Sequence, residues 1–376
     1  MAARGLRLLT VAVAAAIVVA ACGSDDTDSD AQGDSSTTAG SGGGDIRVGL
    51  PAERCDANRK AGKLLFLTSF DYAAAASIAD VVAAEEQGYY DDVCLDLELQ
   101  PGFSTDNASL VAAGRAQMTS MGSFSEVAVA NSSDTDLVAV GVEGHTSIDE
   151  LLVNNDSGVT ELTDLTGKNI GIKGAIPFSI RAMLAKAGVD EGSLKQIQVG
   201  FNPVVLFEQD IAALPGYKSN EPFQLDAAGY KGRYHVFDPR DFDIPASFAV
   251  FATSQSYAEE HPTAVADFLR ATLHGFDWAA ENPDAAVAAT LARSDPKNFF
   301  TPEGEKFRWT TEATLVKDTT PAGQPIGVVD RKQLTEEVDF LVSAGVIPKG
   351  KVDVEAASDP SFVEEVTEEG KVVWFG

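Results

Sequence analysis

The sequence predicts an α/β fold built as two lobes, and three observations lead to this prediction. Short apolar runs with strand character alternate with helical segments, as in open sheets that carry helices on both faces. The alternation starts again after residue 150. The body of about 325 residues, from roughly 50 to 376, is also longer than one core of this kind usually holds. We therefore expect two lobes.

The charge balance limits the classes of partner. The chain has 376 residues, with 28 basic and 57 acidic side chains and a net charge of −29. Binding of nucleic acid needs clustered Lys and Arg, so this balance argues against it. An acidic protein remains suited to a neutral or cationic small molecule, and its charge favours solubility.

Residues 1–21 are predicted to be a signal peptide. Arg4 and Arg7 precede an apolar run over 8–21, which has the length of a signal-peptide core and is short for a bilayer span. The run ends in VAAC at 19–22, which resembles a bacterial lipobox with Cys22 as the lipidated residue. Lipid chains there would hold the protein at the extracytoplasmic face of the cell membrane. The alternative is an ordinary signal peptide with an incidental Cys.

Residues 22–61 are predicted to hold the lipidated Cys and a disordered tether, because 23–49 are mostly Gly, Ser, Thr and Asp. Cys55 and Cys94 are then an even pair in an oxidising compartment, which predicts a disulfide, with two free buried thiols as the alternative. The four His residues are scattered along the chain. We therefore expect no metal site.

The elements before residue 150 follow the alternation. A strand over 63–68 precedes an Ala-rich helix over 72–87 that ends at Gly88. Strands are predicted over 93–99, 117–122 and 136–142, and a helix over 106–114 that Asp106 can cap. Ser123 and Glu126 have capping-box spacing, so a further helix is predicted to begin there.

The second half repeats the pattern and then becomes helical. Strands are predicted over 168–173, 196–201, 234–237 and 247–253. Helices are predicted over 177–188 and 203–214, and from Asn220 onward. After residue 254 the sequence predicts helices over 261–282, 283–293, 302–316 and 330–344. Ligands of such sheets bind beyond the carboxyl ends of the strands, near helix N-termini.

No motif of a known enzyme is present. The chain has no dinucleotide-binding Gly pattern, phosphate loop, nucleophile elbow or zinc-protease motif. We expect a binding protein that is no enzyme and uses no cofactor.

Several segments together resemble the solute-binding proteins of bacterial ABC importers, in the branch that groups binders of thiamine pyrimidine precursors with binders of sulfonate and taurine. The resemblance covers roughly 62–295. It lies in AEEQGYY at 84–90 with LDLEL at 95–99, LVAAGRAQ at 110–117, LTGKNIGI at 165–172, and HPTAVADFLRA at 261–271 with AENP at 280–283.

This resemblance implies a type II fold like that of periplasmic binding proteins, with two lobes joined by two hinge strands near 150 and 245. Lobe 1 would take 62–150 plus 245–376, and lobe 2 would take 151–244. The lobes would close around a small-molecule solute by a hinge. The resemblance also implies a monomer that delivers its solute to an ABC permease and ATPase.

The segment GYKSNEPFQLDAAG at 216–229 is similar to the pyrimidine-precursor branch. Glu221 could accept hydrogen bonds from an aminopyrimidine, or it could only complement the positive end of its helix beside Pro222. The other predicted ligand-binding residues follow strands or open helices, where the Ser, Thr and Asp residues could equally be caps and the Phe residues core. The full predicted set is Phe70, Asp71, Tyr72, Ser104, Thr105, Ser123, Phe124, Ala175, Phe178, Asn220 and Glu221.

The chain departs from the branch after its first strand. That branch usually has a Trp there, often with an Asn and a His, whereas residues 69–75 read SFDYAAA. Riboflavin would suit a site widened by the alanines, and an alkanesulfonate or taurine is a further alternative. An enzyme resembling the eukaryotic pyrimidine synthases would need a Cys-rich run, and this chain has three Cys.

Overall fold

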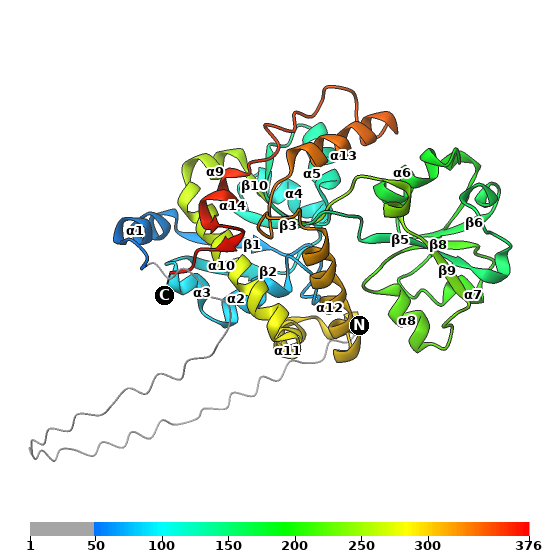
Figure 1. Ribbon diagram of the computed structural model, residues 1–376, viewed down its shortest axis with the longest axis horizontal. Helices are drawn as coiled ribbons and strands as arrows, with labels where there is room; N and C mark the ends of the chain where they lie inside the picture. Colours follow the sequence, from blue (N-terminus) through cyan, green and yellow to red (C-terminus); the bar gives the residue numbers. More distant parts are fainter. Residues whose placement is uncertain (1–48, 376) are drawn as a thin grey trace, which may run out of the picture. The chain divides into compact units, whose positions relative to one another are not determined.

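The computed structural model describes residues 49–375, and within them the chain forms a two-lobed α/β fold with two mixed five-stranded sheets (Figure 1). The predicted signal peptide, the lipidation at Cys22 and most of the predicted tether lie outside the described residues. No helix within 49–375 is long and apolar enough to cross a membrane.

The first sheet has the strand order β2-β1-β3-β10-β4. Strands β1, β2 and β3 run parallel, while β10 runs antiparallel to both of its neighbours. The carboxyl ends of β1, β2 and β3 therefore lie at one edge, together with the start of β10. Its strands are β1 (Lys63–Leu67), β2 (Asp96–Gln100), β3 (Met118–Met121), β4 (Leu137–Gly144) and β10 (Phe248–Ser254).

The second sheet repeats this plan with the order β7-β6-β8-β5-β9. Strand β6 is parallel to β7 and β8, and β5 is antiparallel to β8 and β9. The chain passes between the two sheets twice, from β4 to β5 and from β9 to β10. Its strands are β5 (Asp149–Asn154), β6 (Asn169–Ile172), β7 (Lys195–Gln198), β8 (Ala213–Tyr217) and β9 (Tyr234–Phe237).

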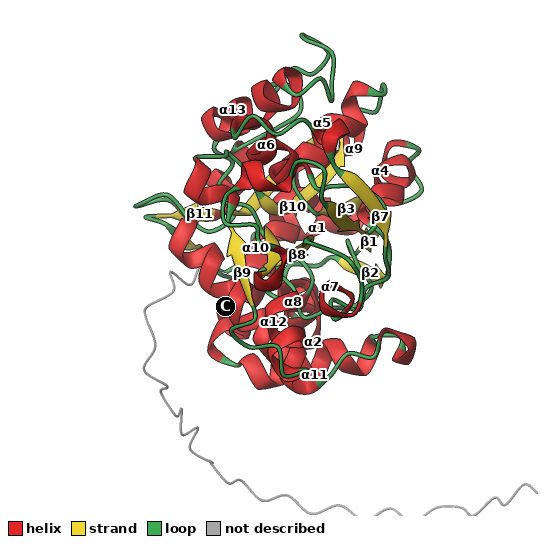
Figure 2. Cartoon of the chain, turned by 90° about the vertical axis from the view of Figure 1, so that its right-hand side faces the viewer, coloured by secondary structure: helices red, strands yellow, loops and turns green. Residues whose placement is uncertain are grey.

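Helices surround both sheets (Figure 2). Those before β5 are α1 (Ala52–Ala61), α2 (Ala79–Glu86), α3 (Tyr89–Asp92), α4 (Ser104–Ala112) and α5 (Phe124–Ser132). Those of the second lobe are α6 (Phe178–Lys186), α7 (Val205–Glu208) and α8 (Glu221–Ala227). Those after β10 are α9 (Gln255–Glu260), α10 (Pro262–Glu281), α11 (Pro283–Arg293), α12 (Pro302–Thr319), α13 (Arg331–Ser343) and α14 (Ser361–Val366), and a hairpin of β11 (Thr367–Glu368) and β12 (Lys371–Val372) follows.

Apolar side chains fill both faces of the first sheet. Phe66 packs against Phe268 of α10, with ring centroids 5.1 Å apart, on one face. Met121 and Phe124 belong to the cluster on the other face. Burying a large side chain of this kind stabilises the fold by roughly 1.5–3 kcal/mol. The short apolar runs that predicted these strands thus correspond to burial on both faces of the sheet.

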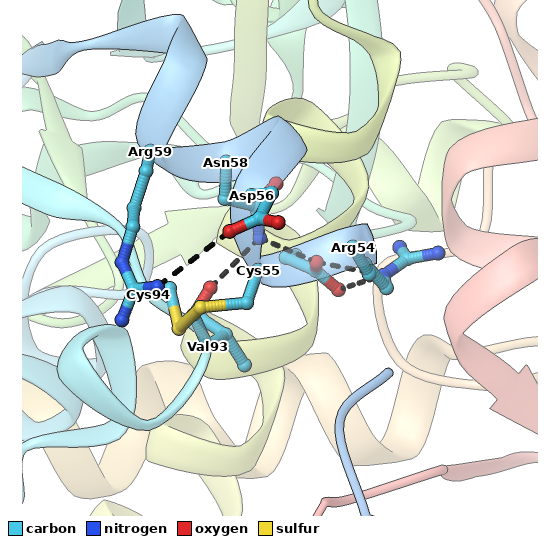
Figure 3. The surroundings of a disulfide bond; sticks show 8 residues. Arg54, Cys55, Asp56, Asn58, Arg59, Val93 and Cys94 are labelled. Atoms are coloured by element: carbon cyan, nitrogen blue, oxygen red, sulfur yellow. Dashed lines mark hydrogen bonds and ion pairs between the residues drawn. A yellow bond between two sulfur atoms is a disulfide. The ribbon is translucent and has the colours of Figure 1, made fainter. Parts of the chain in front are cut away.

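Helix α1 is fixed to the first lobe, although its residues fall in the predicted tether. Cys55 and Cys94 form a disulfide with an S–S distance of 2.06 Å (Figure 3). Beside it, Asn58 donates a hydrogen bond of 2.7 Å to the carbonyl oxygen of Val93. Arg54 also pairs with the fully buried Asp267 of α10 at 2.7 Å. Residues 52–61 of the predicted tether are therefore helical and held to the first lobe.

The predicted helix over 72–87 is only half present, because α2 begins at Ala79. Residues 71–78 form an irregular loop in which Asp71 and Ser77 have φ of 35° and 62°. Alanine favours helix on intrinsic propensity. Here the backbone N–H groups of Ala74 and Ala76 are bound by side chains of a distant helix, so tertiary contacts override that preference.

The predicted helix over 203–214 is also wrong in its second half. It shortens to α7, and residues 213–217 form β8 in the centre of the second sheet. Pro215 and Gly216 lie inside this strand, and both residue types disfavour a strand assignment. Strand β5, which pairs with β8, is absent from the prediction. These two strands determine the second lobe's contribution to the candidate site.

Candidate functional site

The candidate site lies where the strand ends of the two sheets meet the segments that connect the lobes. Strands β1, β2 and β3 end before the loops that start at Thr68, Pro101 and Gly122. In the second sheet, Tyr217 at the end of β8 pairs directly with Asp149 at the start of β5. Ligands of open α/β sheets bind at such edges because helix N-termini and loop side chains converge there.

An aromatic wall forms the first-lobe side. The Phe70 ring meets the Phe103 ring edge to face with centroids 5.5 Å apart, and it lies 6.3 Å from the Phe300 ring. Phe103 is 55% exposed, so its face is available to another flat group. Asp71 supports the wall, because its carboxylate accepts a 2.9 Å hydrogen bond from the backbone N–H of Asp295 in the segment that leads to Phe300.

Glu126 provides a carboxylate beside this wall. Its carboxylate accepts a 2.9 Å hydrogen bond from the N–H of Gly122, so the predicted capping box with Ser123 does not form. Burial raises the pKa of Glu126, and hydrogen bonds from Gly122 and from the Ser104 hydroxyl partly oppose this rise. Ser104 directly follows Phe103, which places the carboxylate and the aromatic wall side by side.

The second lobe contributes Asp149 and Tyr217. The Ser179 hydroxyl, near the start of α6, donates a 2.6 Å hydrogen bond to the Asp149 carboxylate. Burial raises the pKa of Asp149 to about 6, against the Ser179 hydrogen bond that lowers it, and the charge of Glu126 raises it further. Two carboxylates from different lobes therefore act on each other.

Burial and carboxylates on four different helices and strands raise the pKa of Tyr217. Desolvation raises the pKa of its hydroxyl well above the ordinary value, and the charges of Asp149, Glu126, Glu221 and Glu312 add to the rise. The residue is nevertheless 45% exposed. Tyr217 is thus an accessible aromatic side chain that stays neutral and stands among carboxylates of both lobes.

These contacts close into a ring. Arg308 of α12 lies over the Phe300 ring, 5.7 Å from its centroid, and donates a 2.9 Å hydrogen bond to Asn220. Asn220 in turn donates its backbone N–H to the carbonyl oxygen of Tyr217. The site ring, as we call it, comprises Phe70, Phe103, Ser104, Glu126, Asp149, Tyr217, Asn220, Phe300 and Arg308.

Three predicted ligand-binding residues have side chains that are buried or hydrogen-bonded within the protein. Tyr72 is 8% exposed and its hydroxyl donates to the carbonyl oxygen of Leu99 at 3.0 Å. Phe124 is completely buried in the first-lobe core. Glu221 is 3% exposed, and its carboxylate accepts from Lys173 and, at 2.7 Å, from the backbone N–H of Tyr217. Core packing, hydrogen bonds to the backbone and the ion pair with Lys173 account for these three side chains.

The remaining predicted residues lie at the same edges. Phe70, Ser104 and Asn220 belong to the site ring. Thr105 and Ala175 are exposed, Ser123 is half-buried at the start of α5, and Phe178 packs against the apolar cluster of the first lobe. Phe178 therefore contributes to contact between the lobes.

The sequence did not predict the other six members of the site ring, namely Phe103, Glu126, Asp149, Tyr217, Phe300 and Arg308. A signal was available for Tyr217, which stands three residues before Asn220 in the segment that resembles the pyrimidine-precursor branch. Asp149 begins a short apolar run that can be interpreted as a strand. Within 49–375 no group of three or more His, Cys, Asp or Glu side chains is arranged to hold a metal ion.

Solved structures share the fold. The alkanesulfonate-binding protein SsuA from Xanthomonas axonopodis pv. citri, bound to MOPS, covers 79% of this chain and 98% of its own, with a TM-score of 0.58 and 14% identity. The desulfurization enzyme DszB covers 80% and 98%, with a TM-score of 0.51 and 14% identity. The chain therefore has the fold of the periplasmic-binding-protein class, which binding proteins and at least one enzyme share.

The chain belongs to the NMT1/THI5-like family, which matches residues 75–286, more than half of its length. A formylaminopyrimidine-binding protein from Halalkalibacterium halodurans is 27% identical over 266 residues, which are 69% of this chain and 78% of the relative. A riboflavin-binding protein, RibY, from Chloroflexus aurantiacus is 27% identical over 217 residues, 54% of this chain and 58% of the relative.

Proposed function

We propose that this protein is the extracytoplasmic solute-binding component of an ABC importer, and that its solute is a flat nitrogen heterocycle with N–H donors, an aminopyrimidine of the thiamine-precursor type. The observation that carries the proposal is the composition of the site ring. Exposed faces of Phe103 and Tyr217 stand in one ring with the carboxylates of Asp149 and Glu126. The formylaminopyrimidine-binding relative supports the same solute class.

An aminopyrimidine has the donor groups and the flat face that the site ring can bind. Its exocyclic amino group donates hydrogen bonds, and an ionised carboxylate is the strongest acceptor among side chains. Each such bond contributes about 1.5–3 kcal/mol, and offset stacking on an aromatic ring adds about 0.5–1.5 kcal/mol. Two hydrogen bonds, one stacking contact and the buried apolar area bring a small solute to micromolar affinity, about −8 kcal/mol.

A sulfonate fits the site ring less well than an aminopyrimidine does. Two unit charges 4 Å apart interact by about 4 kcal/mol at an effective dielectric constant of 20, so an anion beside Asp149 or Glu126 would be repelled by an amount of that order. The nearby cations already have carboxylate partners, since Lys173 pairs with Glu221 and Arg308 with Glu305. Helix N-termini remain the sulfonate's available partners.

Riboflavin is the second solute to consider, because a relative that binds it covers half of this chain. The predicted widening by alanines does not support it, since Ala73, Ala74 and Ala76 are buried. The exposed faces of Phe103 and Tyr217 would accept an isoalloxazine ring as readily as a pyrimidine. Purified protein that carries riboflavin would be yellow.

Calorimetric titration of the purified protein with 4-amino-2-methylpyrimidine, riboflavin and ethanesulfonate tests the proposal. We expect micromolar binding of the pyrimidine, a loss of at least tenfold in affinity for Tyr217→Ala and Asp149→Asn, and no change for Val236→Ala. Val236 is a control because it is 41% exposed and lies within β9, outside the site ring. Binding of ethanesulfonate alone, or equal losses in all three variants, would refute the assignment.

We also propose that the protein is exported, lipidated at Cys22 and held at the cell membrane as a monomer, where it releases its solute unchanged to the permease and ATPase. Metabolic labelling with a radioactive fatty acid should label the wild type and leave Cys22→Ala unlabelled. Solute recovered after incubation should have its original mass. A chemically altered product would instead indicate an enzyme, as for the structural neighbour DszB.

A further inference from the structure

Helix α12 holds the loop that follows β1. The backbone N–H of Ala74 donates to Glu305 at 2.7 Å, and that of Ala76 donates to Glu312 at 2.8 Å. The two glutamates are seven residues apart, about two helical turns, so they lie on one face of α12. Both are almost completely buried. Each N–H group would otherwise be left buried without a partner, which costs about 1–3 kcal/mol.

The same helix contacts the second lobe. The Ser219 hydroxyl, just before α8, donates a 2.6 Å hydrogen bond to Glu312. One turn earlier on α12, Arg308 binds Asn220, and the Phe307 ring stacks on the Phe223 ring of α8 with centroids 5.3 Å apart. Helix α12 therefore joins the site loop of one lobe to the start of α8 in the other.

Glu312 is the point at which both connections meet. One of its carboxylate oxygens accepts from Ala76 in the first lobe, and the other accepts from Ser219 in the second. Ser219 is 1% exposed and Glu312 is 4% exposed, so water does not substitute for this bond while the lobes are together. Moving α8 away from α12 would leave the carboxylate with the first-lobe contact only.

We propose that Glu312 is a positioning residue that couples the loop carrying Phe70 to closure of the second lobe. The inference rests on the proposed function in one respect, namely that closure serves solute binding. The two hydrogen bonds of Glu312 link the lobes in addition to the two chain segments that connect the sheets. Ser219 makes the link on the second-lobe side, and Asn220 with Arg308 reinforces it at the rim of the site ring.

The test compares Ser219→Ala with Thr314→Ala in the full chain without solute. Ser219→Ala removes the cross-lobe bond and leaves the Ala76 contact intact. Thr314 is a matched control because it is an exposed residue of α12 whose hydroxyl binds only the carbonyl oxygen of Thr310. Spin labels on the unnatural residue p-acetylphenylalanine at Lys60 and Lys195, one in each lobe, report the distance between the lobes.

We expect Ser219→Ala to shift the distance distribution to longer values, while Thr314→Ala keeps the wild-type distribution. The dissociation rate of 4-amino-2-methylpyrimidine should rise about tenfold in Ser219→Ala, with the association rate little changed. A purely structural Glu312 would instead lower the melting temperature and leave the distances as they are. If Ser219→Ala fails to fold, Ser219→Gly, which also removes the hydroxyl, carries the same distance test.

Wild-type distances in the Ser219 variant that folds would overturn the proposal. The distance measurement needs no solute, so its outcome is independent of whether the pyrimidine binds. Longer distances without pyrimidine binding would support the link and reject the proposed solute. Unchanged distances with tight pyrimidine binding would reject the link and leave the proposed function standing.

Discussion

Glu337 is expected to make the protein less stable as pH rises. This residue of α13 is 3% exposed, and its carboxylate accepts hydrogen bonds from the Ser125 backbone N–H at 2.7 Å and from the Ser247 hydroxyl at 2.9 Å. Burial raises its pKa to about 7 from the ordinary value of 4.5, although the serine hydrogen bonds lower it. The folded protein therefore binds this proton more tightly than the unfolded chain does.

Proton linkage determines the sign and the size of the change in the free energy of unfolding with pH. A folded pKa above the unfolded value means that this contribution to stability is fully present below about pH 4.5 and is lost as pH rises through about 7. A difference of this size corresponds to about 3 kcal/mol in the free energy of unfolding. Most of it, about 2–3 kcal/mol, should disappear between pH 5 and pH 8.5.

The variant Glu337→Gln isolates this effect. Its amide oxygen can still accept from Ser125, its amide nitrogen can donate to Ser247, and the group no longer titrates. Urea unfolding followed by tryptophan fluorescence at pH 5 and 8.5 should show a smaller loss of stability in the variant, by about 2–3 kcal/mol. Glu336→Gln, one residue away and exposed, should keep the wild-type slope. Identical slopes for wild type and Glu337→Gln would refute the reasoning.

Three further changes should have measurable effects. Replacing Cys55 and Cys94 by Ser opens a link with a sequence separation of 39 and should lower the free energy of unfolding by about 4 kcal/mol in urea titrations, whereas an unchanged midpoint would contradict this. Gly275→Ala should cost about 2–3 kcal/mol, because the new Cβ would lie 2.4 Å from the Asp80 carbonyl oxygen, and a wild-type melting curve would exclude the clash. Asp80→Asn should raise the melting temperature at pH 8, since burial raises the pKa of both Asp80 and the fully buried Glu143 and the charge of Asp80 raises that of Glu143 further, and a lower melting temperature would argue against repulsion between these two carboxylates.

Much of the fold follows from local sequence pattern. Strands such as β1 and β10 are buried on both faces, so their apolar runs are easy to recognise. The first part of the predicted helix over 72–87 is not helical, because Glu305 and Glu312, more than 200 residues away, bind the N–H groups of Ala74 and Ala76. Strand β8 was missed because Pro215 and Gly216 interrupt its pattern, although the neighbouring strands supply its pairing.

The location of the candidate site could be predicted from the sequence better than the residues that form it. Strand ends locate the edge, which explains why Phe70, Ser104 and Asn220 were selected. Which side chains face that edge depends on partners distant in sequence. Helix α12 shows the difficulty most clearly, because it buries Glu305, Arg308 and Glu312. Charged residues at those spacings normally predict a solvated face.

The position of the solute in the site ring is the central claim, and a crystal structure of the protein with bound 4-amino-2-methylpyrimidine tests it directly. The ring of the solute should lie against Phe103 or Tyr217, with its amino group within hydrogen-bond distance of Asp149 or Glu126. A solute held away from these four residues would contradict the account. So would a complex in which a sulfonate group occupies the position beside the two carboxylates.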